Sequence, residues 1–254
     1  MDTKKVVAQL YTLRQFCKTA EDLAETFKKV RNIGYEAVQV SGIGPIAPEK
    51  VKELADKEGL KIVVTHVPYS RLKNDLDALI KEHKMWDCYY IGLGSMPPEY
   101  RTSKEGFIAF AKEFNEIAKR ISDNGLKFVY HNHKFEFEKF DGLTGLEIIF
   151  NETDPEVFQF EIDTYWVQAG GGNPTDWIRK MKGRMDVVHL KDMAIVKDQQ
   201  VFAEIGQGNL NWHSIIEACE EIGVKWYCVE QDTCMRDPFE SMAISFDYLK
   251  NLKL

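Results

Sequence analysis

The 254-residue sequence has no CxxC pair, no run rich in lysine and arginine, and no apolar segment long enough to cross a membrane. Its five cysteines are scattered, which argues against a disulfide framework and against a thiolate zinc site, so each is predicted to be a buried or partly buried thiol. The balance of 33 basic and 40 acidic residues gives a net charge of −7 and disfavours a nucleic-acid partner. Polar Gln9 and basic Arg14 interrupt the N-terminal apolar residues, so neither a signal peptide nor a membrane partner is expected. The sequence therefore predicts a soluble, cytoplasmic protein.

Low-complexity and linker segments are also lacking, and the longest glycine and proline cluster, AGGGNP at 169–174, is predicted to be one loop. What is present is an alternation of short apolar runs with amphipathic segments. In the segment 19–33, Leu23, Phe27 and Val30 form the apolar stripe of a helix that packs on a sheet. The predicted strands are 6–12, 35–41, 61–67, 88–94, 127–133, 157–163, 185–191 and 225–231.

Eight strands alternating with helices over this length predict an α/β fold, a single-domain (β/α)₈ TIM barrel spanning residues 1–254. A doubly wound open sheet is the competitor. It usually has fewer strands at this length, and no predicted strand leads into a helix through a GxGxxG turn.

The C-terminal ends of the predicted strands carry polar groups that do not belong in a core. In a TIM barrel these ends and the loops after them form the active face. A divalent cation is the economical explanation, because buried carboxylates would otherwise repel one another. These residues include Gln9, Tyr11, Gln39, Ser41, His66, His131, Asn132, His133, Glu161, Asp163, His189, Lys191, Asp192, Glu230, Gln231 and Asp232.

The segments YHNHKFEF, EIDTYW, HLKD and VEQD, with the later GQGNLNW, resemble the xylose isomerase-like barrel superfamily, which includes sugar-phosphate isomerases and epimerases, inosose dehydratases and endonuclease IV. The resemblance spans essentially the whole chain. It implies a divalent metal ion (Mn, Mg, Zn or Co) bound by Asp163, His189 and Glu230. The fourth ligand is expected to be His131, at a position where relatives often carry glutamate, and this change removes a negative charge and a general base.

The resemblance further implies an isomerase or epimerase that acts on a sugar, keto-sugar or sugar phosphate by removing a proton next to a metal-polarised carbonyl. Glu230 is expected to be the base, and Lys191 and His133 are candidates for the second proton transfer. Lys191 could instead pair with Glu161 or Asp163, and Glu161 is expected to bond a lysine or tyrosine. The candidate substrate contacts are His66, Glu136, Trp166, Gln9 and Tyr11.

Each substrate contact has an alternative interpretation: His66 as a loop cap, Glu136 as a solvated charge and Trp166 as plain packing. Because His131 weakens a two-carboxylate scheme, a lyase or dehydratase acting on a keto-glycoside or inosose is the main alternative. An endonuclease IV-like phosphodiesterase and a non-catalytic barrel that binds a sugar or a protein are weaker ones. The sequence leaves the oligomeric state open, a homo-oligomer included.

Overall fold

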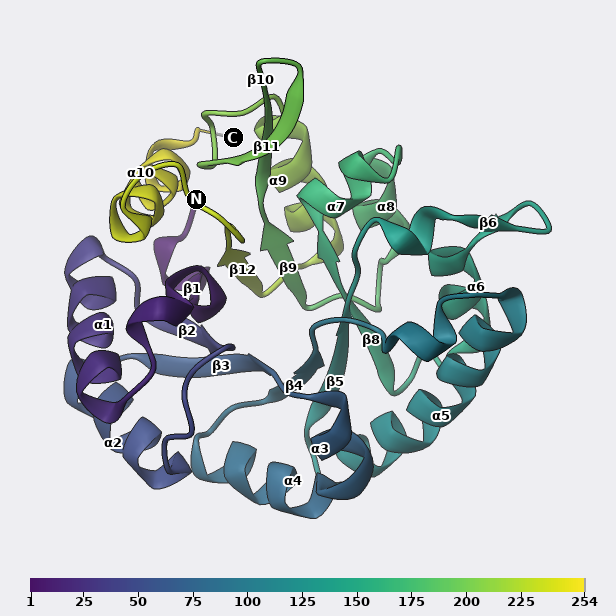
Figure 1. The fold of residues 1–254 in the computed structure, drawn as a ribbon, viewed down its shortest axis with the longest axis horizontal. Coiled ribbons are helices and arrows are strands. Elements are labelled where there is room, and N and C mark those ends of the chain that lie inside the picture. The colour runs from purple at the N-terminus through teal and green to yellow at the C-terminus, as the bar shows by residue number, and fades with distance from the viewer. Residues whose placement is uncertain (254) are drawn as a thin grey trace.

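The computed structural model describes residues 1–253, and its centre is a closed barrel of eight parallel strands (Figure 1). The first strand pairs with the second on one side and with the last on the other, which closes the barrel and excludes an open sheet. Each predicted strand segment contains one of the barrel strands, so the predicted fold class is confirmed. The strands are β1 Val6–Gln9, β2 Ala37–Val40, β3 Lys61–His66, β4 Tyr90–Leu93, β5 Lys127–His131, β8 Phe158–Asp163, β9 Val187–Leu190 and β12 Trp226–Val229.

Helices surround the barrel on its outside (Figure 1). The first begins after Thr19, whose hydroxyl accepts the amide N–H of Asp22 while the Asp22 carboxylate accepts that of Thr19, a reciprocal cap. Its predicted apolar stripe, Leu23, Phe27 and Val30, is fully buried. The helices are α1 Ala20–Ile33, α2 Pro48–Glu58, α3 Tyr69–Asn74, α4 Leu76–Met85, α5 Lys104–Asp123, α6 Gly145–Glu152, α7 Thr164–Ala169, α8 Pro174–Lys180, α9 Trp212–Ile222 and α10 Pro238–Asn251. No helix within residues 1–253 combines the length and the apolar character needed to cross a bilayer.

Two small hairpins lie outside the barrel, and neither was predicted. One joins β6 Lys139–Phe140 to β7 Leu143–Thr144, and the other joins β10 Asp192–Val196 to β11 Gln199–Ala203. Short 3₁₀ helices are η1 Thr3–Lys5, η2 Leu10–Phe16, η3 Pro98–Tyr100 and η4 Phe135–Phe137.

The buried apolar residues form two clusters. The larger one includes the inward faces of the outer helices, and a smaller one draws members from every barrel strand except β8. Because side chains alternate along a strand, the residue two positions after a member of the smaller cluster points to the same side. Val187 thus leads to His189 and Lys191, Cys228 to Glu230, and Val129 to His131. The alternation places these polar side chains together, above an apolar floor.

Candidate active site

Four strand-end side chains that the sequence singled out as metal ligands lie together. One donor atom from each of His131, Asp163, His189 and Glu230 lies within 4.8 Å of the other three, and all four residues are buried. Parallel register aligns Asp163 with His189 on neighbouring strands. Two imidazoles and two carboxylates form a donor set that suits Mn, Zn or Co, and Mg less well. These residues could therefore hold a divalent cation.

Contacts around the quartet fix how its side chains point. His131 Nδ1 lies 2.9 Å from the Gly94 carbonyl oxygen, so its Nε2 faces Asp163 Oδ2 at 3.1 Å. The other oxygen of Asp163 accepts the amide N–H of Trp166 at 2.9 Å, which caps α7. His189 Nδ1 lies 2.9 Å from Glu230 Oε2. Such partners hold ligand side chains in a binding orientation.

A second cluster lies beside the first and shares His189. Glu161 contacts His66 Nε2 at 2.5 Å, His189 Nε2 at 3.1 Å and Gln39 Nε2 at 3.0 Å. The expected lysine or tyrosine partner of Glu161 is therefore wrong. Gln39 also accepts from His189 Nε2 at 2.8 Å, so its amide bridges the two charged groups. The sequence analysis placed Gln39 and Glu161 at strand ends but assigned neither of them a metal-binding, catalytic or substrate-binding role.

The protonation of this region follows from burial and from its carboxylates. Burial alone would lower the pKa of His189, but Glu161 and Glu230 outweigh it and raise that pKa to about 10. Burial likewise opposes ionisation of Glu161, yet His189 and His66 hold its pKa below the usual range. A cation bound by the quartet would compete with the proton on His189.

Lys191 is buried and lies among three carboxylates. Its Nζ is 2.7 Å from Glu230 Oε2, 3.1 Å from Asp163 Oδ2 and 3.0 Å from Asp232 Oδ2. Burial favours the neutral amine, but these carboxylates outweigh it and raise the pKa of Lys191. Lys191 thus pairs with Asp163, as one of the alternatives from the sequence had it, and also with Asp232. With Glu161, Asp163, Glu230 and Asp232 ionised and His189 neutral as a metal ligand, four negative charges face the single positive charge of Lys191. A divalent cation would offset two of the three that remain.

His133 and Trp166 place unpartnered polar atoms near the quartet. His133 Nδ1 and Trp166 Nε1 are buried and have no hydrogen-bond partner among the described residues. Their rings lie 5.2 Å apart, and Lys191 Nζ lies 5.3 Å from the Trp166 ring. Burial lowers the pKa of His133 to about 2, so the imidazole is neutral. His133 lines the cavity, whereas Trp166 is not among its described lining residues, so only the His133 ring borders the space that a bound molecule would fill.

Glu136 is neither solvated nor part of the cavity lining found within residues 1–253. Its carboxylate accepts from the Tyr130 hydroxyl at 2.6 Å and from the His133 amide at 2.9 Å. Burial raises its pKa to about 8. Glu136 therefore holds the backbone of His133 in place through this hydrogen bond.

Gln9 and Tyr11 occupy different surroundings although they are two residues apart. Gln9 is fully buried, accepts the amide of Tyr11 at 3.1 Å and leaves its Nε2 without a partner among the described residues. Tyr11 is half-exposed, lines the cavity and stacks against Arg14.

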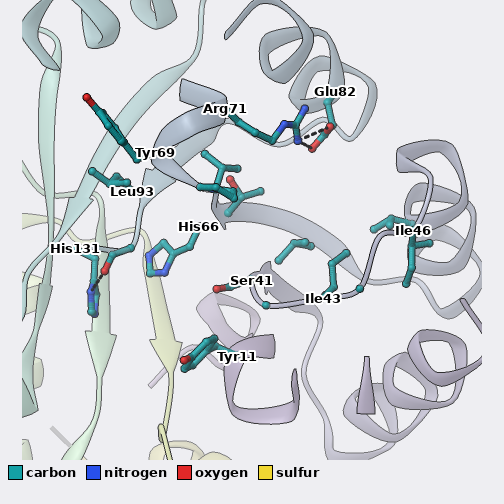
Figure 2. A pocket seen from close by; sticks show the side chains of 18 of the residues that line it. Tyr11, Ser41, Ile43, Ile46, His66, Tyr69, Arg71, Glu82, Leu93 and His131 are labelled. Atoms are coloured by element: carbon teal, nitrogen blue, oxygen red, sulfur yellow. Dashed lines mark hydrogen bonds and ion pairs between the residues drawn. The ribbon is translucent and has the colours of Figure 1, made fainter. Parts of the chain in front are cut away.

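A cavity of about 1190 Å³ opens over the quartet. Its lining includes His66, His131, His133, Glu230 and Asp232. Figure 2 shows His66 between His131 on one side and Ile43 and Ile46 on the other. The cavity thus has a polar end at the quartet and extends past His66 toward Ile43 and Ile46.

The GQGNLNW segment is organised by Asp192. The buried Asp192 carboxylate accepts the amides of Met193, Gly206, Gly208 and Leu210 and the indole N–H of Trp212, at 2.6 to 3.2 Å. A Cβ at Gly208 would collide with this carboxylate. Since these amides already bind the Asp192 carboxylate, they do not form a cradle for a phosphate group.

The remaining two histidines and the cysteines are not members of the quartet. His83 is buried and bonds Thr65 Oγ1 and the Leu79 carbonyl, whereas His213 is exposed. Four cysteines are buried and Cys234 is partly buried, as predicted.

Barrel, strand-end donors and sequence together define the class of protein. The xylose isomerase-like TIM barrel family matches residues 27–252, and the chain belongs to this family. Inosose dehydratase of Clostridium beijerinckii is 23% identical over 217 residues, which cover 78% of this chain and 67% of that protein. Matches to further inosose dehydratases span 51% to 56% of their lengths.

Solved structures share the fold. A sugar phosphate isomerase/epimerase from Parabacteroides distasonis ATCC 8503 superimposes with a TM-score of 0.82 and 24% identity, covering 98% of this chain and 94% of the other. A xylose isomerase-like TIM barrel protein from Mycobacterium smegmatis, crystallised in complex with magnesium, gives a TM-score of 0.75 with 14% identity and coverages of 97% and 95%. At these identities the likeness shows the fold alone.

Proposed function

We propose that the protein is a metal-dependent enzyme that removes a proton next to the carbonyl group of a keto-sugar, keto-glycoside or inosose, and that elimination of the β substituent follows. The observation that carries the proposal is the buried quartet His131, Asp163, His189 and Glu230, open to a cavity and balanced by Lys191. A divalent cation held there would polarise the carbonyl and acidify the adjacent C–H bond.

Glu230 is the proposed base. Its contacts with His189 and Lys191 both involve Oε2, which leaves Oε1 to accept the proton from carbon. The Lys191 ammonium lies close enough to stabilise negative charge that develops on the substrate. His133 lines the cavity, and its unpartnered Nδ1 is the proposed contact for a substrate hydroxyl group.

Elimination fits this set of residues better than epimerisation does. In elimination the C–H electron pair becomes the new C=C bond, the β C–O bond breaks, and the proton taken by Glu230 can pass to the leaving oxygen, which departs as water or an alcohol. One carboxylate suffices. Epimerisation requires a second acid–base group on the opposite face, and β5 ends in His131 instead of a carboxylate. The sequence likeness to inosose dehydratases supports the same choice.

Isomerisation or epimerisation is the second candidate. The free Nδ1 of neutral His133 favours it, because that atom could serve as the second proton-transfer group.

The test uses an inosose and a 3-keto-glycoside, each with Mn²⁺ or Mg²⁺ in deuterated water. We expect absorbance from an α,β-unsaturated ketone, abolished by Glu230→Gln and retained by the control His213→Ala on the exposed face of α9. Deuterium at the α carbon with a rearranged but saturated product would favour the second candidate. Metal binding with neither exchange nor turnover would overturn both and favour a non-catalytic barrel.

A further inference from the structure

The cavity is larger than the polar end of the site requires. Its volume of about 1190 Å³ exceeds the ~300–1,000 Å³ of pockets that bury drug-sized ligands, and a single sugar ring is smaller than such ligands. Beyond His66 the walls come from the loop after β2, from α2 and from the segment after β3. We call this part the apolar lobe, defined by Ile43, Ile46, Val51, Val67 and Trp86.

Polar groups beside the apolar lobe already have protein partners. The Trp86 indole N–H donates to the Pro48 carbonyl at 2.8 Å. Thr65 Oγ1 is bonded to His83 at 2.8 Å. The apolar lobe therefore offers few hydrogen bonds to sugar hydroxyls.

A phosphate group is poorly matched to the apolar lobe. Of the lysine and arginine side chains in residues 1–253, Arg71 alone lines the cavity. Its guanidinium lies 3.1 Å from Glu82 Oε2 and 3.2 Å from Asp75 Oδ2, so two carboxylates already neutralise it (Figure 2 shows the pair with Glu82). An anion there would face Glu82, whose side chain is 10% exposed.

We infer that the substrate is a glycoside whose apolar, ring-sized aglycone occupies the apolar lobe while its sugar lies over the quartet. The sugar half of this inference rests on the proposed function. Because the lobe and the quartet border one continuous cavity, a single molecule can span both. Ile43 and Ile46 are half-buried on their loop, and an aromatic ring between them and Trp86 would remove apolar surface from water.

The test is calorimetric binding of phenyl β-glucoside, methyl β-glucoside and glucose 6-phosphate to the full-length, metal-loaded protein. Burial of a phenyl ring predicts that the phenyl glycoside binds about 10- to 100-fold more tightly than the methyl glycoside. Ile46→Asp should weaken binding of the phenyl glycoside more than binding of the methyl glycoside and so reduce this difference. The matched control is Ile195→Asp, on the exposed β10 strand, where 59% of the residue is accessible.

Equal binding of the phenyl and methyl glycosides, or tighter binding of glucose 6-phosphate, would overturn the inference. So would an equal loss of both glycosides in Ile46→Asp. These readouts do not depend on turnover. A preference for the phenyl glycoside without turnover of any keto-glycoside would support an aglycone in the apolar lobe but contradict the proposed function. Turnover without a preference for the phenyl glycoside would support the proposed function but contradict an aglycone in the apolar lobe.

Discussion

Lys191 Nζ lies 2.7 Å from Glu230 Oε2 although both side chains are buried. The lysine also faces Asp163 and Asp232, so its removal would leave three carboxylates with one compensating charge fewer. We predict that Lys191→Met lowers the free energy of unfolding by about 3–5 kcal/mol in the presence of a chelator. A saturating divalent ion should recover part of the loss. Urea unfolding measures both, with exposed Lys81→Met as control, and equal losses in the two variants would contradict the prediction.

The quartet predicts about one divalent ion per chain. Elemental analysis of the wild type should find it, and the double variant Asp163→Asn/His189→Gln should lose it, because one carboxylate and one imidazole are replaced by weaker donors. His213→Ala should keep the ion. Circular dichroism must show that the double variant is folded, and an ion retained by the folded double variant would place the metal elsewhere.

The buried carboxyl of Glu136 predicts that the difference in stability between Glu136→Gln and the wild type depends on pH. Burial raises its pKa to about 8, so the folded state retains a proton that the unfolded state releases above its ordinary pKa of 4.5. This contribution of Glu136 therefore lowers stability progressively from pH 4.5 to pH 8. Glu136→Gln should match the wild type near pH 4.5 and exceed it by an amount on the order of 3 kcal/mol above pH 7. Denaturant titrations at pH 5 and pH 8 measure this, and a pH-independent difference would show that Glu136 is not held protonated.

The hydrogen bonds to Asp192 predict that its replacement destabilises the segment 204–212. Asp192→Ala leaves several buried N–H groups around residues 206–212 without their acceptor, at about 1–3 kcal/mol for each one left unsatisfied. The expected result is a loss of at least about 3 kcal/mol in urea unfolding and faster proteolysis within 204–212. Asp192→Asn should lose less because it retains one acceptor oxygen. Exposed Glu217→Ala is the control.

The barrel could be predicted because its signals are local. Each strand is a short apolar run, and the polar residues at strand ends follow the same alternation, so His131, Asp163, His189 and Glu230 could be assigned to one rim before their distances were known.

Contacts across the barrel could not be read in this way. Gln39 on β2 reaches Glu161 on β8, and those strands are not neighbours in the sheet, so the contact depends on barrel closure and strand stagger. A carboxylate in a loop is usually solvated, but Glu136 is buried because the Tyr130 hydroxyl and the His133 amide donate hydrogen bonds to it. The β10–β11 hairpin left a weak signal in the sequence: four polar residues, 197–200, separate the apolar runs 193–196 and 201–203. The structure places the turn at Lys197 and Asp198, both with positive φ.

Strand β4 and the residue after it carry glycine at positions where neighbouring strands carry functional side chains. A Cβ at Gly92 would collide with the Thr65 carbonyl oxygen, and one at Gly94 would lie 2.8 Å from His66 Nδ1. The imidazole of His66 thus packs against Gly92 in β4 and against Gly94, which directly follows the strand, while the Gly94 carbonyl bonds His131. The rim is therefore asymmetric because one side of it lacks side chains. A saturation scan should find position 92 intolerant of even alanine, because the contact is with backbone, whereas alanine at position 94 should displace the His66 ring.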